Sequence, residues 1–291
     1  MRRVALDPSA LPFTLVPLTL PVILRPFILH PSSCGLRLKP RRRLRPALEL
    51  PAFPPGVVFL EGGRERVLGA VRDRADAPYD LVLFDMDGTL VDEMSSWEFV
   101  HEHFQVSNDA NWARYNRGEI DDLEFMRTDI ALWGIERRPI HLDDVARVLE
   151  RAPIMRNAPR VMRALRDRGV ATGIVSGGMD ILAHRVAEAL EMDLYLANGL
   201  AADAQGYLTG EGVLFIEIRD KGAPTRSIVR ASGAAKERTA SVGNSRWDVT
   251  MFRETGFGVA INPFDDEVRK GANVTVEGTD MLPVLEALLA E

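Results

Sequence analysis

Residues 81–90 have the sequence LVLFDMDGTL, and this stretch decides the predicted fold. Four apolar residues typical of a buried strand lead directly into Asp85 and Asp87, and Gly88 allows a sharp turn after them. Because side chains alternate along an extended segment, the two carboxyl groups are expected on the same side. A strand with this ending places acidic groups at the carboxyl edge of a sheet, where open α/β sheets bind ligands. Two carboxylates this close repel each other unless a cation lies between them or one is protonated.

The chain beyond residue 80 alternates between predicted strands and helices. Further strand candidates are the apolar runs 170–175, 193–197, 239–242, 257–261 and 273–276. Residues 198–216 have the composition of a hairpin, with turn residues at Gly206 and Gly210. The alternation predicts an α/β fold with a doubly wound parallel sheet, a Rossmann-like core.

Helical segments interrupt this alternation once, directly after the first strand. They are predicted over residues 95–104, 109–116, 121–133 and 142–152, with no strand between them. Ser95 and Asp121 have the residue types of helix N-caps. We therefore expect a helical cap over about residues 93–153, inserted into a core that spans residues 80–291.

Charge and proline content divide the chain near Asp80. The 291 residues have a net charge of −6, which argues against a nucleic-acid partner for the chain as a whole. Residues 1–80 contain 13 Lys and Arg against 7 Asp and Glu, a net charge of +6, and 12 of the 18 prolines. The remaining residues contain 23 against 35, a net charge of −12. Residues 1–79 are accordingly predicted to be a disordered extension, or translated sequence upstream of the native start.

The first part of the chain also raises the question of a membrane segment. Residues 8–24 carry no charge, but Pro12, Pro17 and Pro21 would interrupt a helix there. The run is also shorter than the roughly 20 residues that cross a bilayer, so no membrane association is expected. The only cysteine, Cys34, excludes an internal disulfide or a multi-cysteine metal site and is consistent with a cytoplasmic location.

Polar side chains follow the ends of other predicted elements. Ser176 and Gly177 follow the strand 170–175 and open a helix, which is a suitable arrangement for binding an anion. Lys221 precedes a helix, and Asn244 and Asp248 flank the turn after 239–242. Each alone is commonly a helix cap or a solvated surface residue. Together they supply carboxylates, a phosphate cradle, a cation and oxygen ligands at one sheet edge, which phosphoryl transfer through an aspartate with Mg²⁺ requires.

This combination resembles the haloacid dehalogenase superfamily of phosphohydrolases. The resemblance covers about residues 80–291 and rests on four stretches in the same order: DMDGTL at 85–90, VSGGMD at 175–180, Lys221, and GNSRWD at 243–248. The helical cap, the SGGMD form of the second stretch, ANGL at 197–200 and LTG at 208–210 are most similar to phosphoserine phosphatases and their relatives.

The resemblance implies a role for each of these residues. Asp85 attacks phosphorus and becomes an aspartyl phosphate, and Asp87 protonates the leaving alcohol and then activates water. Ser176 and the Gly177 N–H bind the phosphoryl oxygens, and Lys221 offsets their charge. Mg²⁺ would be held by the Asp85 carboxylate, the Asp87 carbonyl and the Asn244 side chain. Asp248 would either bind the metal directly or support its ligands through hydrogen bonds. The implied substrate is a small phosphorylated metabolite.

The sequence departs from the family pattern at the metal and in the cap. The family usually has an aspartate where Asn244 stands. Its phosphoserine phosphatases use a glutamate after the first motif and an arginine in the cap, and this chain has Met94 and Asp129 at those positions. Glu93 and Arg127 lie close by and are candidate replacements, although a shift along a helix turns a side chain to another face.

Two alternatives therefore stand beside a phosphoserine phosphatase-like hydrolase. The chain could hydrolyse another small phosphomonoester or transfer phosphate to an alcohol. It could also be a binding or regulatory protein that kept the fold and lost turnover, and Asn244 is the feature that favours this. The sequence does not determine the oligomeric state.

Overall fold

The computed structural model describes residues 52–70, 77–135 and 137–290. The predictions for residues 1–51, including the uncharged run and its prolines, lie outside the described residues. Within the described part of the chain, none of the helices has the length and apolar character needed to cross a membrane.

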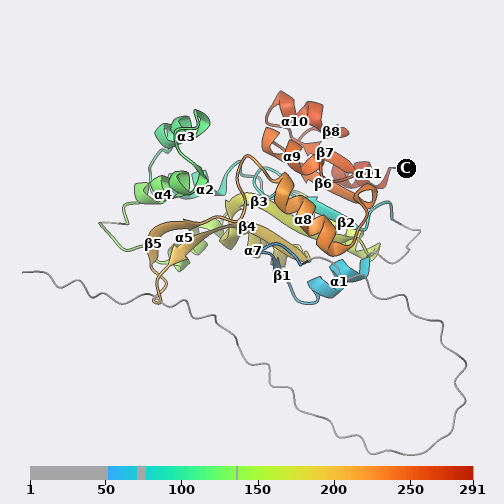
Figure 1. The fold of residues 1–291 in the computed structure, drawn as a ribbon, viewed down its shortest axis with the longest axis horizontal. Coiled ribbons are helices and arrows are strands. Elements are labelled where there is room, and N and C mark those ends of the chain that lie inside the picture. The colour runs from blue at the N-terminus through green and yellow to red at the C-terminus, as the bar shows by residue number, and fades with distance from the viewer. Residues whose placement is uncertain (1–51, 71–76, 136, 291) are drawn as a thin grey trace, which may run out of the picture. The chain divides into compact units, whose positions relative to one another are not determined.

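A parallel sheet forms the centre of the molecule (Figure 1). Its strand order is β4-β3-β2-β6-β7-β8, and all five neighbouring pairs are parallel. The strands are β2 (Leu81–Phe84), β3 (Ala171–Met179), β4 (Leu194–Ala202), β6 (Thr239–Gly243), β7 (Phe257–Ile261) and β8 (Val274–Val276). The chain runs outward from β2 in one direction and then restarts at β6 in the other. This is a doubly wound order, so the predicted α/β fold is confirmed.

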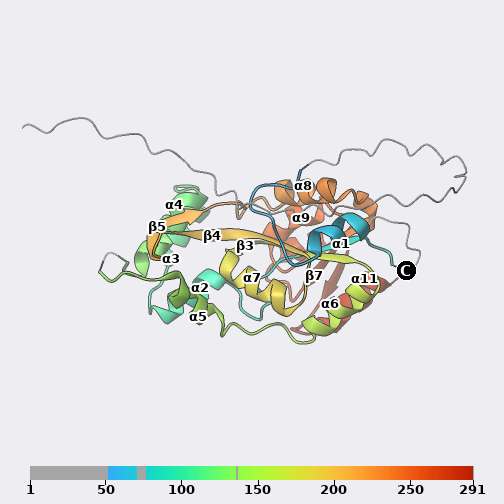
Figure 2. The same cartoon turned by 90° about the horizontal axis from the view of Figure 1, so that it is seen from below.

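Both faces of the sheet are covered by helices, as a parallel sheet requires (Figure 2). Side chains of β2 alternate between two apolar cores: Val82 and Phe84 pack into one, and Leu81 and Leu83 into the other. The first core is completed by α6 (Ala158–Asp167), α7 (Asp180–Ala189) and α11 (Leu282–Leu289). The second is completed by α1 (Gly63–Ala70), α8 (Gly222–Ser232), α9 (Val249–Phe252) and α10 (Asp266–Gly271).

The predicted cap is present between β2 and β3 as four helices. They are α2 (Ser96–His103), α3 (Asp109–Asn116), α4 (Asp122–Leu132) and α5 (Leu142–Leu149). Ser95 caps α2 by accepting a hydrogen bond from the Glu98 N–H at 3.2 Å, and Asp121 caps α4 through the Glu124 N–H at 2.8 Å. Both predicted N-caps are confirmed.

A hairpin of the core supports the cap. The predicted hairpin is formed by the second half of β4 and by β5 (Leu208–Val213), which pair antiparallel. Helix α4 packs against β5, and both lie at the end of the molecule away from the C-terminus (Figure 1). The cap therefore rests on an extension of the sheet.

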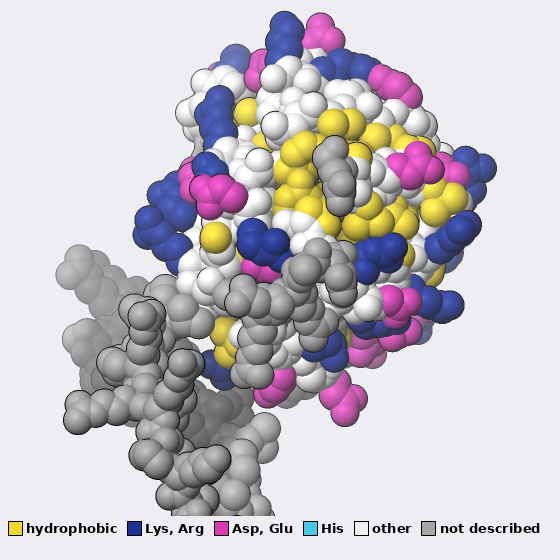
Figure 3. All heavy atoms as spheres, turned by 90° about the vertical axis from the view of Figure 1, so that its right-hand side faces the viewer, with side chains coloured by type: hydrophobic (Ala, Val, Ile, Leu, Met, Phe, Trp, Pro, Cys, Tyr) yellow, Lys and Arg dark blue, Asp and Glu magenta, His cyan; other side chains and the backbone are white. Residues whose placement is uncertain are grey.

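The opposite side, which carries the C-terminus, exposes a group of hydrophobic side chains between charged ones (Figure 3).

The folded unit begins before the boundary that composition predicted at residue 80. Strand β1 (Val58–Phe59) pairs antiparallel with the edge strand β4, and Val67 of α1 is buried in the second core. Arg66 also forms an ion pair with the buried Asp193. Composition missed this segment because two strand residues and a short helix are too few to shift an average over 80 residues.

Two substitutions in α1 test whether this helix belongs to the folded unit. Val67→Asp places a charge in the second core and should lower the free energy of unfolding by about 3 kcal/mol or more. Leu68→Asp is the matched control, because Leu68 is 39% exposed and its replacement should change stability by less than about 0.5 kcal/mol. Urea unfolding of the full chain measures both, and equal effects would contradict the packing of α1 on the sheet.

Candidate active site

The predicted site residues meet at the carboxyl edge of the sheet, where the strand order changes direction between β2 and β6. Asp85 follows β2, Ser176 ends the regular part of β3, and Asn244 follows β6. Lys221 joins them from the start of α8. All four are buried, with exposed fractions of 4% or less. The prediction that these residues lie at one sheet edge therefore agrees with the structure.

Lys221 bridges two carboxylates in this site. Its Nζ lies 2.7 Å from Asp85 Oδ1 and 2.7 Å from Asp248 Oδ1. Burial alone would lower the pKa of Lys221, but the charges of Asp248 and Asp85 hold that pKa above its usual range. The lysine therefore stays charged and compensates two buried carboxylates at once.

Asp248 positions its neighbours through both of its carboxylate oxygens. Its Oδ2 accepts hydrogen bonds from the N–H groups of Asn244 and Ser245, both at 3.0 Å, and from the Ser245 hydroxyl at 3.1 Å. Its Oδ1 accepts from Lys221. With both oxygens engaged, Asp248 is suited to hold Lys221 and the turn that carries Asn244. Of the two roles predicted for it, the geometry favours the indirect one.

Asp85 and Asp87 have different surroundings although they are two residues apart. Burial, reinforced by the charge of Asp248, raises the pKa of Asp85 to about 7, while Lys221 acts to lower it. Burial also raises the pKa of Asp87, against the opposing effect of its hydrogen bonds from Ser96. Lys221 thus stabilises the ionised Asp85 that an attack on phosphorus needs. A raised pKa helps Asp87 to carry the proton that a general acid donates.

Ser96 fixes the orientation of the Asp87 side chain. The Ser96 N–H and hydroxyl donate to Asp87 Oδ2 at 2.9 and 2.8 Å. This leaves Asp87 Oδ1 buried and without a hydrogen bond from the described residues. Ser96 was not among the predicted site residues, because the preceding serine, Ser95, already accounts for the helix cap. A second polar residue at the start of α2 was the available signal.

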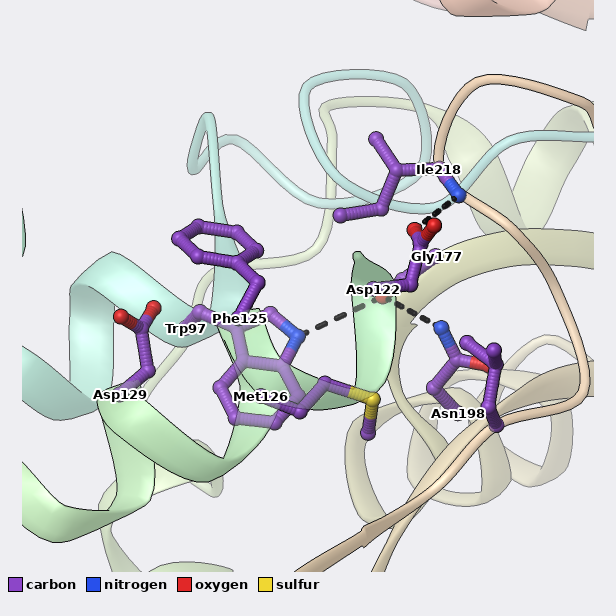
Figure 4. Close-up of a pocket in the computed structure, with 9 residues that line it drawn as sticks. Trp97, Asp122, Phe125, Met126, Asp129, Gly177, Asn198 and Ile218 are labelled. Atoms are coloured by element: carbon purple, nitrogen blue, oxygen red, sulfur yellow. Dashed lines mark hydrogen bonds between the residues drawn. The ribbon is translucent and has the colours of Figure 1, made fainter. Parts of the chain in front are cut away.

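The proposed phosphate cradle lies directly beside Asp87. Ser176 Oγ accepts a hydrogen bond from the Gly178 N–H at 3.1 Å. A Cβ at Gly178 would lie 2.5 Å from Asp87 Oδ2, so only glycine permits this approach. The Gly177 carbonyl accepts hydrogen bonds from Trp97 Nε1 at 3.4 Å and Asn198 Nδ2 at 3.3 Å (Figure 4). The cap and the hairpin therefore both hold the cradle.

The oxygen atoms at the edge fit a divalent cation such as Mg²⁺. Asp87 Oδ1 is buried and accepts no hydrogen bond from the residues that the structure describes, and buried Asp85 Oδ1 has the Lys221 ammonium beside it at 2.7 Å. Gly88 has φ = +70°, and a Cβ there would lie 2.0 Å from Asn244 Nδ2, so the Asn244 amide packs against this turn. Carboxylate, carbonyl and amide oxygens are ligands that Mg²⁺ accepts, and it commonly retains several waters.

The candidate metal site has few charged ligands. Across residues 52–70, 77–135 and 137–290, no three His, Cys, Asp or Glu side chains converge on one point. Asn244 supplies no charge, so a cation here would depend on the Asp85 carboxylate, the Asp87 carbonyl and the Asn244 amide. This set predicts modest affinity for the metal.

The two residues predicted to replace the family's substrate ligands are placed differently. Arg127 lies on the surface of the cap, where it pairs with Glu211 at 2.9 Å and Glu124 at 2.5 Å. The carbonyl of Glu93 accepts a hydrogen bond from the Gly88 N–H at 2.6 Å, and burial raises the pKa of its half-buried side chain. The structure therefore does not bring Arg127 to the phosphate cradle.

Met94 and Asp129, which stand at the family's substrate-binding positions, have other contacts in the structure. Met94 is 46% exposed, and its sulfur lies 3.7 Å from Asn244 Nδ2. Asp129 is 1% exposed and accepts hydrogen bonds from Asn108 and Asn111, both at 2.9 Å. Asp129 also lies 3.1 Å from His101 Nε2. It is held in a polar network inside the cap.

Comparison with known proteins establishes the family. The model of haloacid dehalogenase-like hydrolases matches residues 82–253, and the chain belongs to this family. It is 30% identical over 216 residues to a phosphoserine phosphatase of Idiomarina loihiensis, covering 72% of this chain and 93% of the relative. It is 27% identical over 216 residues to that of Methanocaldococcus jannaschii, covering 71% and 96%. Both relatives are named phosphoserine phosphatases, which are phosphomonoester hydrolases, and this chain is an enzyme of that class.

Solved structures show the same fold. A phosphoserine phosphatase solved as a phospho-aspartyl intermediate analogue matches with a TM-score of 0.61 and 24% identity, over 71% of this chain and 97% of that one. A substrate-bound phosphoserine phosphatase matches with a TM-score of 0.60 and 22% identity, over 74% and 99%.

The raised pKa of Asp85 predicts a pH-dependent stability difference. Because the folded-state pKa of about 7 exceeds the ordinary 3.8, the folded chain favours the protonated carboxyl, and this stability is lost as pH rises through about 7. Asp85→Asn removes the ionisation, so its free energy of unfolding relative to that of the wild type should increase by about 2–3 kcal/mol from pH 5 to pH 8, on top of a pH-independent cost of leaving Lys221 with one carboxylate. Urea unfolding with EDTA present measures this, and a difference independent of pH would contradict it.

Proposed function

We propose that the chain hydrolyses small phosphomonoesters with Mg²⁺, through a phosphorylated Asp85. The observation that supports this most is that two aspartates, two residues apart, have different partners: a charged lysine for Asp85 and a neutral serine for Asp87. Asp85 is ion-paired with Lys221, whereas Asp87 is held by Ser96 with one buried oxygen free. One carboxylate is thereby suited to attack and the other to carry a proton.

The reaction has two balanced steps. An Asp85 carboxylate oxygen attacks phosphorus while the ester P–O bond breaks, and the Asp87 proton passes to the leaving alcohol oxygen. The ionised Asp87 then takes a proton from water, whose oxygen attacks the same phosphorus and releases Asp85 and inorganic phosphate. Ser176, the Gly177 N–H and Lys221 bind the phosphoryl oxygens throughout. When bound, Mg²⁺ would offset charge on the phosphoryl group.

The named homologues make phosphoserine the first substrate candidate, together with other small phosphorylated metabolites. The geometry argues for turnover and against a protein that only binds, since the nucleophile, acid and cradle are assembled at one sheet edge. A cytoplasmic location stays a prediction.

Leaving-group dependence tests the division of roles. The Asp87→Asn variant should release phosphate from ethyl phosphate about 10²–10⁴-fold more slowly, because an alkoxide needs a proton to leave. The first turnover of p-nitrophenyl phosphate should slow far less, because p-nitrophenolate leaves without one. Stopped-flow measurement of the p-nitrophenolate burst and a phosphate assay on ethyl phosphate give the two rates.

Controls separate this from a general loss of activity. Asp85→Asn should release no phosphate from either ester, and EDTA should suppress wild-type turnover until Mg²⁺ is restored. Asp92→Asn, at an exposed acid near the site, should behave as wild type. Wild-type rates in Asp85→Asn, or an equal loss on both esters in Asp87→Asn, would contradict the proposal.

A further inference from the structure

A small pocket lies between the cap and the phosphate cradle. Its wall includes Gly177 of the cradle, Trp97 of α2, and Asp122, Phe125 and Met126 of α4 (Figure 4). Its volume is about 10 Å³, which is the room of about one water molecule. Since Gly177 belongs both to the wall and to the cradle, a group bound in this pocket would lie next to a phosphate in the cradle.

The charged side chains that line the pocket are acidic. Among the residues that the structure describes, no lysine or arginine lines it, whereas Asp122 and Asp129 both do. The nearest cation along the chain from the wall residue Ile218 is Arg219, which is engaged elsewhere. Its guanidinium stands 4.3 Å from the centre of the Tyr115 ring and also donates to the Tyr115 carbonyl.

The two carboxylates of the pocket differ in how far they are satisfied. Both oxygens of Asp129 accept hydrogen bonds from the asparagines of the cap. Asp122 Oδ1 accepts a hydrogen bond from the Tyr115 hydroxyl at 3.0 Å. It also accepts one from the Ile218 N–H at 2.9 Å (Figure 4). Asp122 Oδ2 accepts none from the described residues and is not fully buried. It is therefore the available acceptor in the wall.

The rest of the wall favours a cation or an apolar group over an anion. The hydrogen bond from Trp97 Nε1 to the Gly177 carbonyl fixes the indole ring beside the cradle. Phe125 and Met126 are buried, with 7% and 3% of their surface exposed, and they add apolar surface to the wall. Aromatic faces attract ammonium groups. A carboxylate bound in this pocket would lose its hydration next to the like charges of Asp122 and Asp129, and no cation in the wall would compensate it.

We propose that this pocket selects the phosphate ester of a small alcohol that bears an amine and no carboxylate. The ammonium group contacts Asp122 Oδ2 and the Trp97 ring, while the phosphoryl group occupies the cradle. This inference rests on the proposed phosphatase activity and specifies its substrate class. It makes phosphoserine a poor substrate, although the homologues are named for it.

Three esters of similar size test the selection in the full-length protein with Mg²⁺. O-phosphoethanolamine carries the amine alone, O-phosphoserine adds a carboxylate, and ethyl phosphate carries neither. We expect kcat/KM to be about tenfold or more higher for O-phosphoethanolamine than for ethyl phosphate, and lowest for O-phosphoserine. Hydrolysis of O-phosphoserine at an equal or higher kcat/KM than O-phosphoethanolamine would overturn the inference while leaving the phosphatase activity intact.

A substitution at Asp122 tests the assigned contact. Asp122→Asn keeps an oxygen for the Tyr115 hydroxyl and removes the charge, so it should lower kcat/KM for O-phosphoethanolamine about tenfold, mainly through KM, and leave ethyl phosphate nearly unchanged. Asp121→Asn is the matched control, because it retains the helix cap on the exposed side, and it should leave all three values unchanged.

The outcomes of this test are distinct. An equal loss on O-phosphoethanolamine and ethyl phosphate in Asp122→Asn would assign Asp122 a structural role and overturn the inference. Release of phosphate from none of the three esters by the wild type would remove the proposed function itself, and the inference with it.

Discussion

The bridge of Lys221 between Asp85 and Asp248 is the interaction on which the site depends. Three ionisable groups are held almost without solvent, at separations of 2.7 Å. Removing one member of such a buried set leaves uncompensated charge and typically costs about 3–5 kcal/mol. The bridge also joins three elements, because Asp85 follows β2, Lys221 lies at the start of α8 and Asp248 directly precedes α9. Stability and the position of the nucleophile are therefore coupled.

The topology of the sheet explains how such a site can be assembled. The strand order reverses between β2 and β6, which is the point where open α/β sheets bind ligands at the carboxyl ends of their strands. The insertion after β2 brings the start of the cap to this edge. Ser96 and Trp97, at the first turn of α2, reach back to Asp87 and the Gly177 carbonyl. The cap thus orients Asp87 and helps to hold the cradle.

Much of the core could be predicted from the sequence because its signals are local. Apolar runs that end in Asp85, Ser176 and Asn244 identify both a strand and the edge at which it ends. Parallel pairing then brings those ends together. The family resemblance added the order of roles, and the comparisons confirmed the class of enzyme.

The features that could not be predicted from the sequence depend on the direction of side chains and on contacts between distant segments. Whether Arg127 faces the pocket depends on the helix face it occupies, and Glu124 and Glu211 hold it on the surface. Asp129 is conspicuous as a charge in a helix, but its three amide and imidazole partners are visible only in the fold. The start of the folded unit was misplaced for the same reason, since β1 is defined by its pairing with β4.

The substrate-binding surface follows from the same contacts. With Arg127 outside the pocket and Asp122 inside it, the cap presents negative charge to the group that leaves. Trp97 and Gly177 belong to both the cradle and this pocket, whereas Asp122 lines the pocket alone.

The proposed mechanism requires that Asp85 is phosphorylated during turnover. Acid quenching of the full-length protein during steady-state hydrolysis of p-nitrophenyl phosphate, followed by peptide mass spectrometry, tests this directly. A phosphoryl group is expected on the peptide that contains both residues, attached to Asp85 and not to Asp87. Turnover with no phosphorylated peptide, or with the phosphoryl group on another residue, would contradict it.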